Sequence, residues 1–352
     1  MVEQGETPQS FPLRQLVIIA VVIGIIAVAF AYTAGWLSPQ RVTPEKILSA
    51  MQPPSGPPLG HRRNHVKGIC FTGTFEANGQ GMELSTAQVF ARGQYPVVGR
   101  FNIGGTDPHE PDAMAQVRGV GIRIATPDGQ EWRSAMIDAP VFAAPTGEAF
   151  YQFLTAAGSK DPDAFKKYAA VHPEILNFVG WVKDHVRSES WAEDQFNSLN
   201  SFLFIDAGGT QHAVRWSYVP AAQVVKLTPE ELASRPPDFL AEEITQRVAA
   251  GPQRWDLVIT LANPGDPTSD STKPWPADRR TVNVGTLTVQ RIEPEPDGPC
   301  RDINYDPSVL PSGMSTSDDP IPAARSAAYA VSYDRRTAED SHYPRSAAGA
   351  KQ

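Results

Sequence analysis

Residues 62–77 read RRNHVKGICFTGTFEA, a histidine among basic residues that is followed at once by an alternating run. From Gly68 onward, apolar positions alternate with small or polar ones, which predicts a β-strand with one face in a core. A lone histidine in such a place is more often structural or surface-exposed than catalytic. The role of His65 therefore depends on what the rest of the chain brings to it.

Further strand-like runs follow, and helical segments separate them into two groups. The strand-like runs span residues 82–90, 95–105, 119–137, 201–220, 255–262 and 282–292, with hairpin turns at Asp128-Gly129 and Gly208-Gly209. Helical spacing occupies residues 147–186, and residues 228–251 predict one or two helices, broken at Pro236-Pro237. About eight strands joined mostly by hairpins predict an antiparallel barrel or sandwich with inserted helices, an α+β fold.

The N-terminal part contains an apolar stretch, residues 16–37, without a charged side chain. Such a stretch is long enough to cross a bilayer as a helix, with Arg14 before it and Trp36 near its far end as interfacial residues. It is either an uncleaved anchor or a secretory signal cleaved after Ala29-Phe30-Ala31, and the anchor is favoured because the apolar run continues past that point. Both alternatives place the body of the chain outside the cytoplasm.

The chain is expected to divide into five parts. These are a tail (1–15), the anchor or signal (16–37), a linker with a short amphipathic helix (38–60), one folded domain (61–336) and a disordered tail (337–352). The two cysteines, Cys70 and Cys300, lie far apart in the sequence. They form either a disulfide or two separate buried thiols, and their spacing alone leaves both alternatives open.

Composition narrows the classes of function. The chain has 352 residues, a mass of 38.2 kDa and 41% hydrophobic residues, which is enough for a substantial core. Its formal net charge of −8 and its pI of about 5.4 argue against nucleic-acid binding. No GxGxxG motif follows a strand and no GxxxxGK[ST] motif is present, which argues against a nucleotide cofactor.

Residues 320–336, PIPAARSAAYAVSYDRR, predict a helix that starts at a proline and has an alanine-rich body. Arg325 and Tyr329 are four residues apart and share one face, and Arg336 returns to nearly the same face about three turns later. The stripe is either a solvated surface or a site at which a guanidinium favours the ionised phenolate of the tyrosine. A phenolate is a hard ligand that suits ferric iron.

Six motifs in one order resemble the catalase superfamily, most closely its small catalase-related haem peroxidase branch, over residues 55–340. They are RRNHVKG (62–68), GRFNIGG (99–105), VRGVGIRIATPDGQEW (117–132), FIDAGGTQHAVRWSYV (204–219), DSTKPWP (270–276) with the strand after it, and RSAAY (325–329). The resemblance implies a catalase-like antiparallel eight-stranded β-barrel with inserted helices. It also implies haem, and haem b in particular because the chain has no CxxCH motif for covalent attachment.

The resemblance assigns the two residues that would face the iron. His65 would be the distal acid–base. Tyr329 would be the axial ligand of the haem iron, as tyrosine is in catalase. Arg325 would keep that tyrosine ionised.

The resemblance also assigns residues that would hold the rest of the cofactor. Arg62, Arg100 and Arg336 match the family's propionate-binding arginines, because the carboxylates of a buried haem need cationic partners. Phe150 falls where the family packs an aromatic ring against the haem. An ordinary core role for this phenylalanine fits the sequence equally well.

Three positions depart from the catalase pattern. Counted back from Pro140, Ile137 occupies the position of the distal asparagine, although a shift by one residue would bring Asp138 there instead. Asn102 replaces the serine that supports the distal histidine, and Tyr333 replaces a histidine near the proximal helix. Because an isoleucine cannot hydrogen-bond peroxide, the disproportionation of hydrogen peroxide is expected to suffer most.

Together these features predict a haem peroxidase that reduces hydrogen peroxide or organic hydroperoxides with an organic electron donor and has weak or absent catalase activity. The alternatives are a true catalase, a fatty-acid hydroperoxide lyase or isomerase on the same fold, and a non-catalytic haem-binding protein. The N-terminal helix is expected to anchor the chain in the inner membrane, with the haem domain in the periplasm or elsewhere outside the cytoplasm. No nucleic-acid partner is expected, and monomer and homodimer both stay open.

Overall fold

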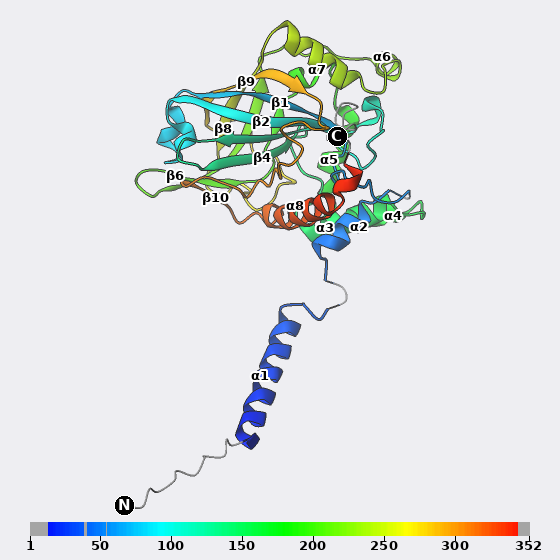
Figure 1. The fold of residues 1–352 in the computed structure, drawn as a ribbon, viewed down its shortest axis with the longest axis vertical. Helices are drawn as coiled ribbons and strands as arrows, with labels where there is room; N and C mark the ends of the chain where they lie inside the picture. The colour runs from blue at the N-terminus through cyan, green and yellow to red at the C-terminus, as the bar shows by residue number, and fades with distance from the viewer. Residues whose placement is uncertain (1–12, 39–40, 54, 344–352) are drawn as a thin grey trace, which may run out of the picture. The chain divides into compact units, whose positions relative to one another are not determined.

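The computed structural model describes residues 13–38, 41–53 and 55–343, and its contacts divide the chain into two units, residues 1–43 and 44–352. In the first unit the chain forms helix α1 (Leu13–Thr33), drawn in blue in Figure 1. It is almost entirely apolar, and none of its residues is buried. Among the described residues, α1 is the one helix that is long and apolar enough to cross a membrane, by length and composition. It ends four residues before the predicted boundary, because the chain turns at Gly35, whose φ is 71°.

The second unit is built on a closed antiparallel barrel of eight strands, as the sequence predicts. The described residues of this unit form ten strands, of which eight make up the ring: β1 (Gly68–Ala77), β2 (Gly93–Ile103), β3 (Arg118–Ala125), β4 (Glu131–Ile137), β5 (Phe196–Asn197), β6 (Phe202–Ile205), β7 (Gln211–Pro220), β8 (Gln253–Leu261), β9 (Thr281–Glu293) and β10 (Met314–Thr316). Around the ring the order is β1, β2, β3, β4, β5, β7, β8 and β9, and β9 pairs with β1 to close it. β6 pairs with β7 outside the ring and β10 pairs with β6.

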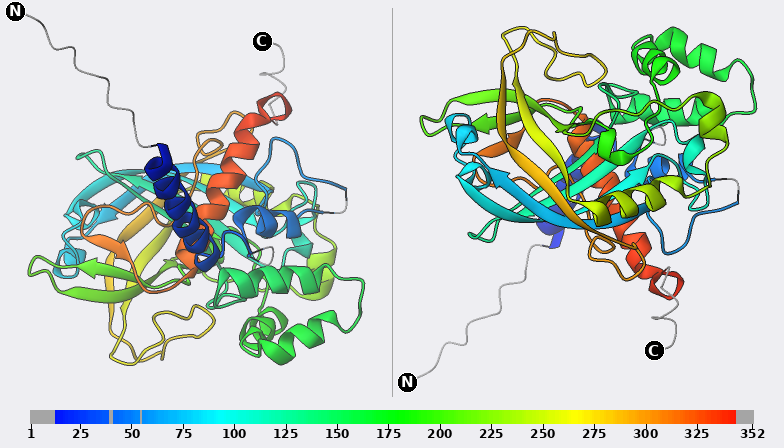
Figure 2. Two further views of the ribbon diagram at one scale, coloured as in Figure 1. Left: turned by 90° about the horizontal axis from the view of Figure 1, so that it is seen from below. Right: turned by 90° about the horizontal axis from the view of Figure 1, so that it is seen from above.

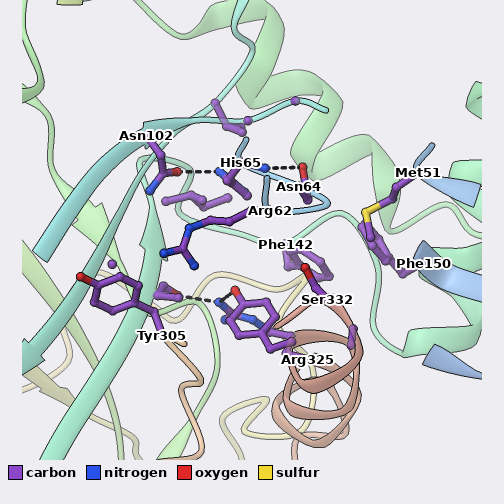
Figure 3. Close-up of a pocket in the computed structure, with 18 of the residues that line it drawn as sticks. Met51, Arg62, Asn64, His65, Asn102, Phe142, Phe150, Tyr305, Arg325 and Ser332 are labelled. Carbon is purple, nitrogen blue, oxygen red and sulfur yellow. Dashed lines mark hydrogen bonds between the residues drawn. The ribbon is translucent and has the colours of Figure 1, made fainter. Parts of the chain in front are cut away.

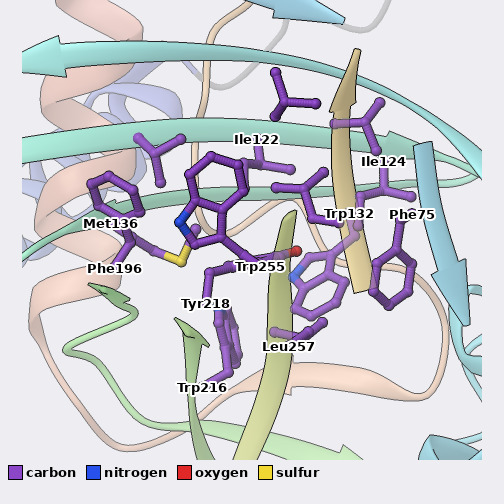
Figure 4. Packing of buried hydrophobic residues seen from close by; sticks show 14 of the residues in the cluster. Phe75, Ile122, Ile124, Trp132, Met136, Phe196, Trp216, Tyr218, Trp255 and Leu257 are labelled. Atoms are coloured by element: carbon purple, nitrogen blue, oxygen red, sulfur yellow. The ribbon is translucent and has the colours of Figure 1, made fainter. Parts of the chain in front are cut away.

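Aromatic side chains fill the inside of the barrel (Figure 4). In β4 the buried residues are Trp132, Ser134 and Met136, which alternate with partly exposed neighbours. Trp132 packs edge-on against Trp216, with 5.0 Å between ring centroids. Burying such rings contributes roughly 2 kcal/mol or more each. Residues that alternate with these inward-facing ones point to the outer face of the barrel.

Helices and short turns complete the body and cover part of that outer face. They are α2 (Pro44–Ala50), α3 (Gly147–Ala157), α4 (Ala164–Val171), α5 (Ile175–Asp184), α6 (Pro229–Ala233), α7 (Phe239–Ala250) and α8 (Ile321–Ala338), with 3₁₀ turns η1 (Gln80–Glu83), η2 (Gln88–Phe90), η3 (Asp112–Met114), η4 (Trp191–Glu193) and η5 (Asp340–His342). α2 contacts both α3 and α8, which brings the first and last helices of the body together. Figure 2 shows from two further sides that α8, in red, runs along the barrel beside α2.

The run at residues 82–90, predicted to be a strand, forms η1 and η2 instead. Its buried apolar residues are Leu84, Ala87, Val89 and Phe90, and their spacing does not keep the period of two that a strand requires. Instead, they join the core of the barrel. The ring needs β5 as its eighth strand, and at two residues β5 is too short to show any alternation.

The folded body begins earlier than the predicted boundary at residue 61. The amphipathic helix expected in the linker is present as α2, but it packs on α3 and α8 and buries Ile47 and Leu48. Pro44 therefore starts the body rather than a free linker. Residues 1–12 of the predicted N-terminal tail lie outside the described residues.

The folded body also ends later than residue 336. α8 continues to Ala338, and the carboxylate of Glu339 accepts a hydrogen bond from the backbone N–H of Gly60 at 2.8 Å and pairs with Arg63. Ordered structure thus reaches residue 343, inside the segment predicted to be disordered. Residues 344–352 lie outside the described residues.

Cys70 and Cys300 form a disulfide with an S–S distance of 2.00 Å, and both are fully buried. The alternative that the sequence left open is therefore decided in favour of the bridge. It ties β1 to the segment between β9 and α8, which passes the cavity described next.

Candidate active site

A cavity of about 490 Å³ lies between the outer face of the barrel and helices α2, α3 and α8. All the residues predicted for the site line it: Arg62, His65, Arg100, Phe150, Arg325, Tyr329 and Arg336. Figure 3 shows His65 with Asn102 on one side and Arg325 on the opposite side, with Arg62 between them. The fold therefore brings together residues from both ends of the body.

The ring of His65 is held by Asn102, the residue that replaces the family's serine. Nδ1 of His65 lies 2.7 Å from Oδ1 of Asn102, and Nδ2 of Asn102 donates to the carbonyl of Arg100 at 3.3 Å. With the amide in this orientation, Nδ1–H of His65 donates and Nε2 is left free to accept a proton. Gly119 makes room for this contact, because a Cβ there would lie 2.5 Å from Oδ1 of Asn102.

His65 is held in its neutral form. The pKa of His65 is lowered to about 4, mainly by desolvation. The charges of Arg100 and Arg325 contribute to this lowering, and the hydrogen bond with Asn102 counteracts it. At neutral pH the ring therefore carries no charge. A neutral imidazole with a free Nε2 is a proton acceptor, which is what a distal acid–base requires.

On the opposite wall, the phenol oxygen of Tyr329 accepts a hydrogen bond from Nη2 of Arg325 at 3.0 Å. Their spacing of four residues on α8 places both on one helix face, as predicted. Arg325 is held in turn by Oδ1 of Asn200 at 2.9 Å and by the carbonyl of Ala135 at 2.7 Å. Asn200 donates to the buried carboxylate of Asp319 at 3.0 Å. A charged donor is thus fixed beside the oxygen that would face the iron.

The arginines at one end of the cavity have buried N–H groups that make no hydrogen bond. Nη2 of Arg62 donates to the carbonyl groups of Cys300, Arg301 and Ile303 at 3.0 to 3.3 Å, and Nη1 of Arg336 donates to the carbonyl of Arg301. Nε of Arg62 and Nη2 of Arg336 are buried and make no hydrogen bond. The pKa of Arg62 is lowered to about 10, mainly by burial and in part by the charge of Arg100. Buried cationic donors that make no hydrogen bond within the protein fit the carboxylates of a haem.

Aromatic and aliphatic side chains line the remaining part of the cavity. Phe150 packs against Phe142, with 5.2 Å between ring centroids, and both face the cavity. Ile47 and Met51 approach from the N-terminal side of the body. A mostly apolar wall with cationic donors at one end fits a flat, apolar ring system that carries carboxylates.

Ile137 lines the cavity and Asp138 does not, which decides the alternative left open by the sequence. The carboxylate of Asp138 accepts a hydrogen bond from the backbone N–H of Arg118 at 3.0 Å, and its other oxygen lies 3.5 Å from Nε2 of His185. Burial raises the pKa of Asp138, although His185 counteracts this effect. The position of the family's distal asparagine therefore presents an apolar side chain to the cavity.

A model of the Catalase family matches residues 58–343. The chain belongs to the catalase family. A catalase-related peroxidase of Synechococcus elongatus is 36% identical over 321 residues, which cover 90% of this chain and 93% of that protein. A catalase-related peroxidase of Mycolicibacterium paratuberculosis is 29% identical over 302 residues, which cover 85% of this chain and 96% of that protein.

Solved structures of the catalase family share the fold. A bacterial catalase has a TM-score of 0.70 at 22% identity and covers 78% of this chain, which corresponds to 57% of that protein. A fungal catalase has the same TM-score at 18% identity, and the match covers 78% of this chain and 59% of that protein. The predicted catalase-like fold is thereby confirmed.

Membership in the catalase family makes this chain an oxidoreductase that acts on peroxide, and it implies haem as the cofactor. The cavity fits that group, because its apolar wall, its phenol oxygen and its buried arginine donors without a hydrogen bond are the contacts a haem needs. Sequence reasoning missed the supports of this site, above all Asn200, Asp319 and Glu295, whose carboxylate lies 2.7 Å from Nη2 of Arg100. They lie in irregular segments where no periodic pattern marks them.

Proposed function

We propose that this chain is a haem b peroxidase that reduces hydrogen peroxide or organic hydroperoxides with an organic electron donor and has little catalase activity. The observation that carries this proposal is the arrangement of one cavity. A neutral His65, held by Asn102, lies opposite Arg325 in the cavity (Figure 3), and Arg325 donates to the phenol oxygen of Tyr329. The apolar Ile137 lines the same cavity at the position of the distal asparagine.

The chain's own residues would bind the cofactor at three places. Tyr329 would ligate the iron through its phenol oxygen, with Arg325 donating to the same oxygen. Arg62 and Arg336 would bind the carboxylates, and Phe150 would pack against the ring. Haem, when bound, supplies the redox chemistry by which peroxide is reduced.

His65 would move the proton. Nε2 accepts the proton of a bound peroxide, and the same nitrogen returns it to the oxygen that leaves as water or alcohol. The hydrogen bond to Asn102 keeps Nδ1 protonated and the ring in one orientation throughout. Acid–base catalysis of this kind contributes a factor on the order of 10² to 10⁴.

Ile137 is the residue that separates a peroxidase from a catalase in this proposal. Disproportionation requires a second hydrogen peroxide to be held as the reductant, and an isoleucine offers it no hydrogen bond. An organic donor needs no such hydrogen bond from Ile137. The proposal therefore assigns the second half of the cycle to an external donor.

The test measures oxygen release and donor oxidation by the full-length chain loaded with haem. With hydrogen peroxide and a simple phenol as donor, we expect donor oxidation with almost no oxygen release. The variant Ile137→Asn should release more oxygen, because the amide restores a hydrogen bond to peroxide.

Each alternative function has its own outcome in the same assay. Rapid oxygen release without a donor would make the chain a true catalase. Consumption of a fatty-acid hydroperoxide without a donor, with a rearranged or cleaved product, would make it a lyase or isomerase. Stable haem binding without peroxide consumption would leave only a haem-binding protein.

We propose further that α1 stays in place as an inner-membrane anchor and that the haem domain lies in the periplasm. The length and composition of α1 support the anchor, and the Cys70–Cys300 disulfide supports an oxidising compartment. Membrane fractionation, protease protection and the mass of the mature N-terminus test both statements. A soluble chain that starts near residue 32 would show a cleaved signal instead.

A further inference from the structure

Glu295 reaches the arginine end of the cavity from the segment between β9 and α8. Its carboxylate accepts two parallel hydrogen bonds from Arg100, Nε to Oε1 and Nη2 to Oε2, both at 2.7 Å. Its Oε1 also lies 3.5 Å from Nε of Arg62. Burial raises the pKa of Glu295, but the charges of Arg100 and Arg62 outweigh this effect and bring it below the ordinary value. The carboxylate is therefore ionised.

The Arg100 guanidinium also donates hydrogen bonds to the backbone around His65. Nη1 donates to the carbonyl of His65 and Nη2 to the carbonyl of Val66, each at 2.8 Å. His65 has a φ of 51°, a left-handed conformation that persists only where the surroundings hold it. Gly68 leaves space for this approach, because a Cβ there would lie 2.6 Å from Cζ of Arg100. Arg100 thus holds the strained segment that carries the distal histidine.

A count of donors separates Arg100 from the two other arginines. A guanidinium has five N–H groups, and Arg100 already makes four hydrogen bonds, to Glu295, His65 and Val66. By contrast, Nη2 of Arg336 is buried without a hydrogen bond, and the hydrogen bonds of Arg62 to the carbonyl groups of Cys300, Arg301 and Ile303 all come from one nitrogen, Nη2. The donors left for an anionic ligand therefore belong mainly to Arg62 and Arg336.

The charge of this cluster also matches a haem. Arg62, Arg100 and Arg336 carry three positive charges and Glu295 carries one negative charge, which leaves a net charge of two for the two haem carboxylates. Asp302 lies 4.0 Å from Nη1 of Arg336, but its side chain is 54% exposed and so is largely screened by water. Without Glu295 the cluster would keep one buried positive charge too many.

We propose that Glu295 is a positioning residue that holds Arg100 against the His65 segment, and that Arg62 and Arg336 bind the haem carboxylates. This inference rests on the proposed function, because it takes haem to be the occupant of the cavity. It assigns Arg100 to the support of the distal histidine, whereas the sequence predicts a propionate contact for it. Glu295 acts through Arg100 and touches neither haem nor peroxide.

The test uses the full-length chain loaded with haem and compares Glu295→Gln with Glu293→Gln. The first change keeps the shape of the side chain and removes its charge, and the second is a matched control at the end of β9 that does not line the cavity. One readout is the rate at which cyanide binds to the ferric haem, because a distal base must take the proton of hydrogen cyanide. The other is the rate at which haem passes to an excess of apomyoglobin.

We expect Glu295→Gln to slow cyanide binding about tenfold or more, because the support of His65 is loosened. Haem transfer should stay unchanged in this variant, since Arg62 and Arg336 keep their donors. Glu295→Asp should recover part of the cyanide rate, and Arg336→Gln should speed haem transfer about tenfold. Glu293→Gln should change neither rate.

Faster haem transfer in Glu295→Gln with an unchanged cyanide rate would overturn the inference. Arg100, paired with Glu295, would then be a residue that binds the haem carboxylates. If Glu295→Gln does not fold, the double variant Arg100→Gln with Glu295→Gln leaves no charge unpaired and takes its place. It should bind cyanide slowly and keep its haem, and a wild-type cyanide rate would count against the proposal. A wild-type chain that binds no haem would instead end the proposed function itself.

Discussion

The two walls of the cavity differ in charge: one keeps a histidine neutral, and the other holds a charged arginine beside a phenol oxygen. On the barrel wall, desolvation and two arginines keep His65 neutral, and Asn102 orients its ring. On the helical wall, a charged donor from Arg325 is fixed against the phenol oxygen of Tyr329, and Asn200 orients that donor. On both walls an asparagine orients the key side chain: Asn102 orients His65, and Asn200 orients Arg325. In the proposed function, the barrel wall accordingly exchanges a proton and the helical wall binds a cation.

The largest effect of a substitution is expected at Tyr329, on the helical wall, because this residue would provide the bond from the protein to the iron. Tyr329→Phe removes only the phenol oxygen, and we expect the chain to lose its haem or to bind it with a different ligand. The absorption spectrum of the purified, haem-supplemented variant measures this. Tyr333→Phe, one turn further along α8, is the matched control and should keep the wild-type spectrum. An unchanged spectrum in Tyr329→Phe would refute the assignment of the ligand.

The next largest effect is expected on the barrel wall. His65→Ala removes the proton acceptor and should slow the reaction with peroxide by a factor on the order of 10² or more, with haem still bound. Stopped-flow absorbance after mixing with peroxide measures the rate. His61→Ala, four residues earlier and outside the cavity lining, should react like the wild type. A normal rate in His65→Ala would remove this residue from the mechanism.

A smaller effect is expected at the support of His65. Asn102→Ala removes the acceptor for Nδ1–H and frees the ring to adopt the other tautomer, which should slow the same reaction about tenfold. Asn102→Ser should recover part of the rate, since a hydroxyl can still accept the hydrogen bond. If serine is no better than alanine, the amide acts through packing rather than through this hydrogen bond.

The smallest change is expected from pH across the neutral range. The pKa of His65 is lowered to about 4, and the neutral ring is the active form, so its activity is present above that pKa and is lost as the pH falls through it. The peroxide reaction should therefore stay constant from about pH 8 to about pH 5 and decline near pH 4. A decline centred near pH 6.5, the ordinary pKa of histidine, would show that the ring is not desolvated in solution.

Local geometry predicts the pairing of Arg325 with Tyr329, whereas the resemblance to the family's motifs assigns His65 and the other residues of the site. Arg325 and Tyr329 meet because they lie four apart on a helix, and Arg100 and Asn102 share the outer face of β2 because they flank Phe101. The barrel was predictable for the same reason, since its long strands alternate. The run at 82–90 misled because its apolar residues cap the barrel core without forming a strand.

The supports of the site could not be predicted because their positions depend on tertiary contacts alone. Asn200 reaches Arg325 across 125 residues, and Glu295 reaches Arg100 across 195. Neither belongs to a periodic pattern, and a glutamate near prolines usually indicates a solvated loop. The sequence also could not predict which arginines would bind the haem carboxylates in the proposed function. That depends on which of their N–H groups already donate to other parts of the fold.

The central claim is that one cavity holds a haem between Tyr329 and His65 and uses it to reduce peroxide. The most direct measurement is the absorption spectrum of the full-length, haem-loaded chain before and after one equivalent of peroxide, with and without a phenolic donor. We expect a spectrum typical of tyrosinate-ligated ferric haem, a rapid change on adding peroxide, and a faster return to the starting spectrum when the donor is present. A haem spectrum that is indifferent to peroxide, or no haem band at all, would contradict it.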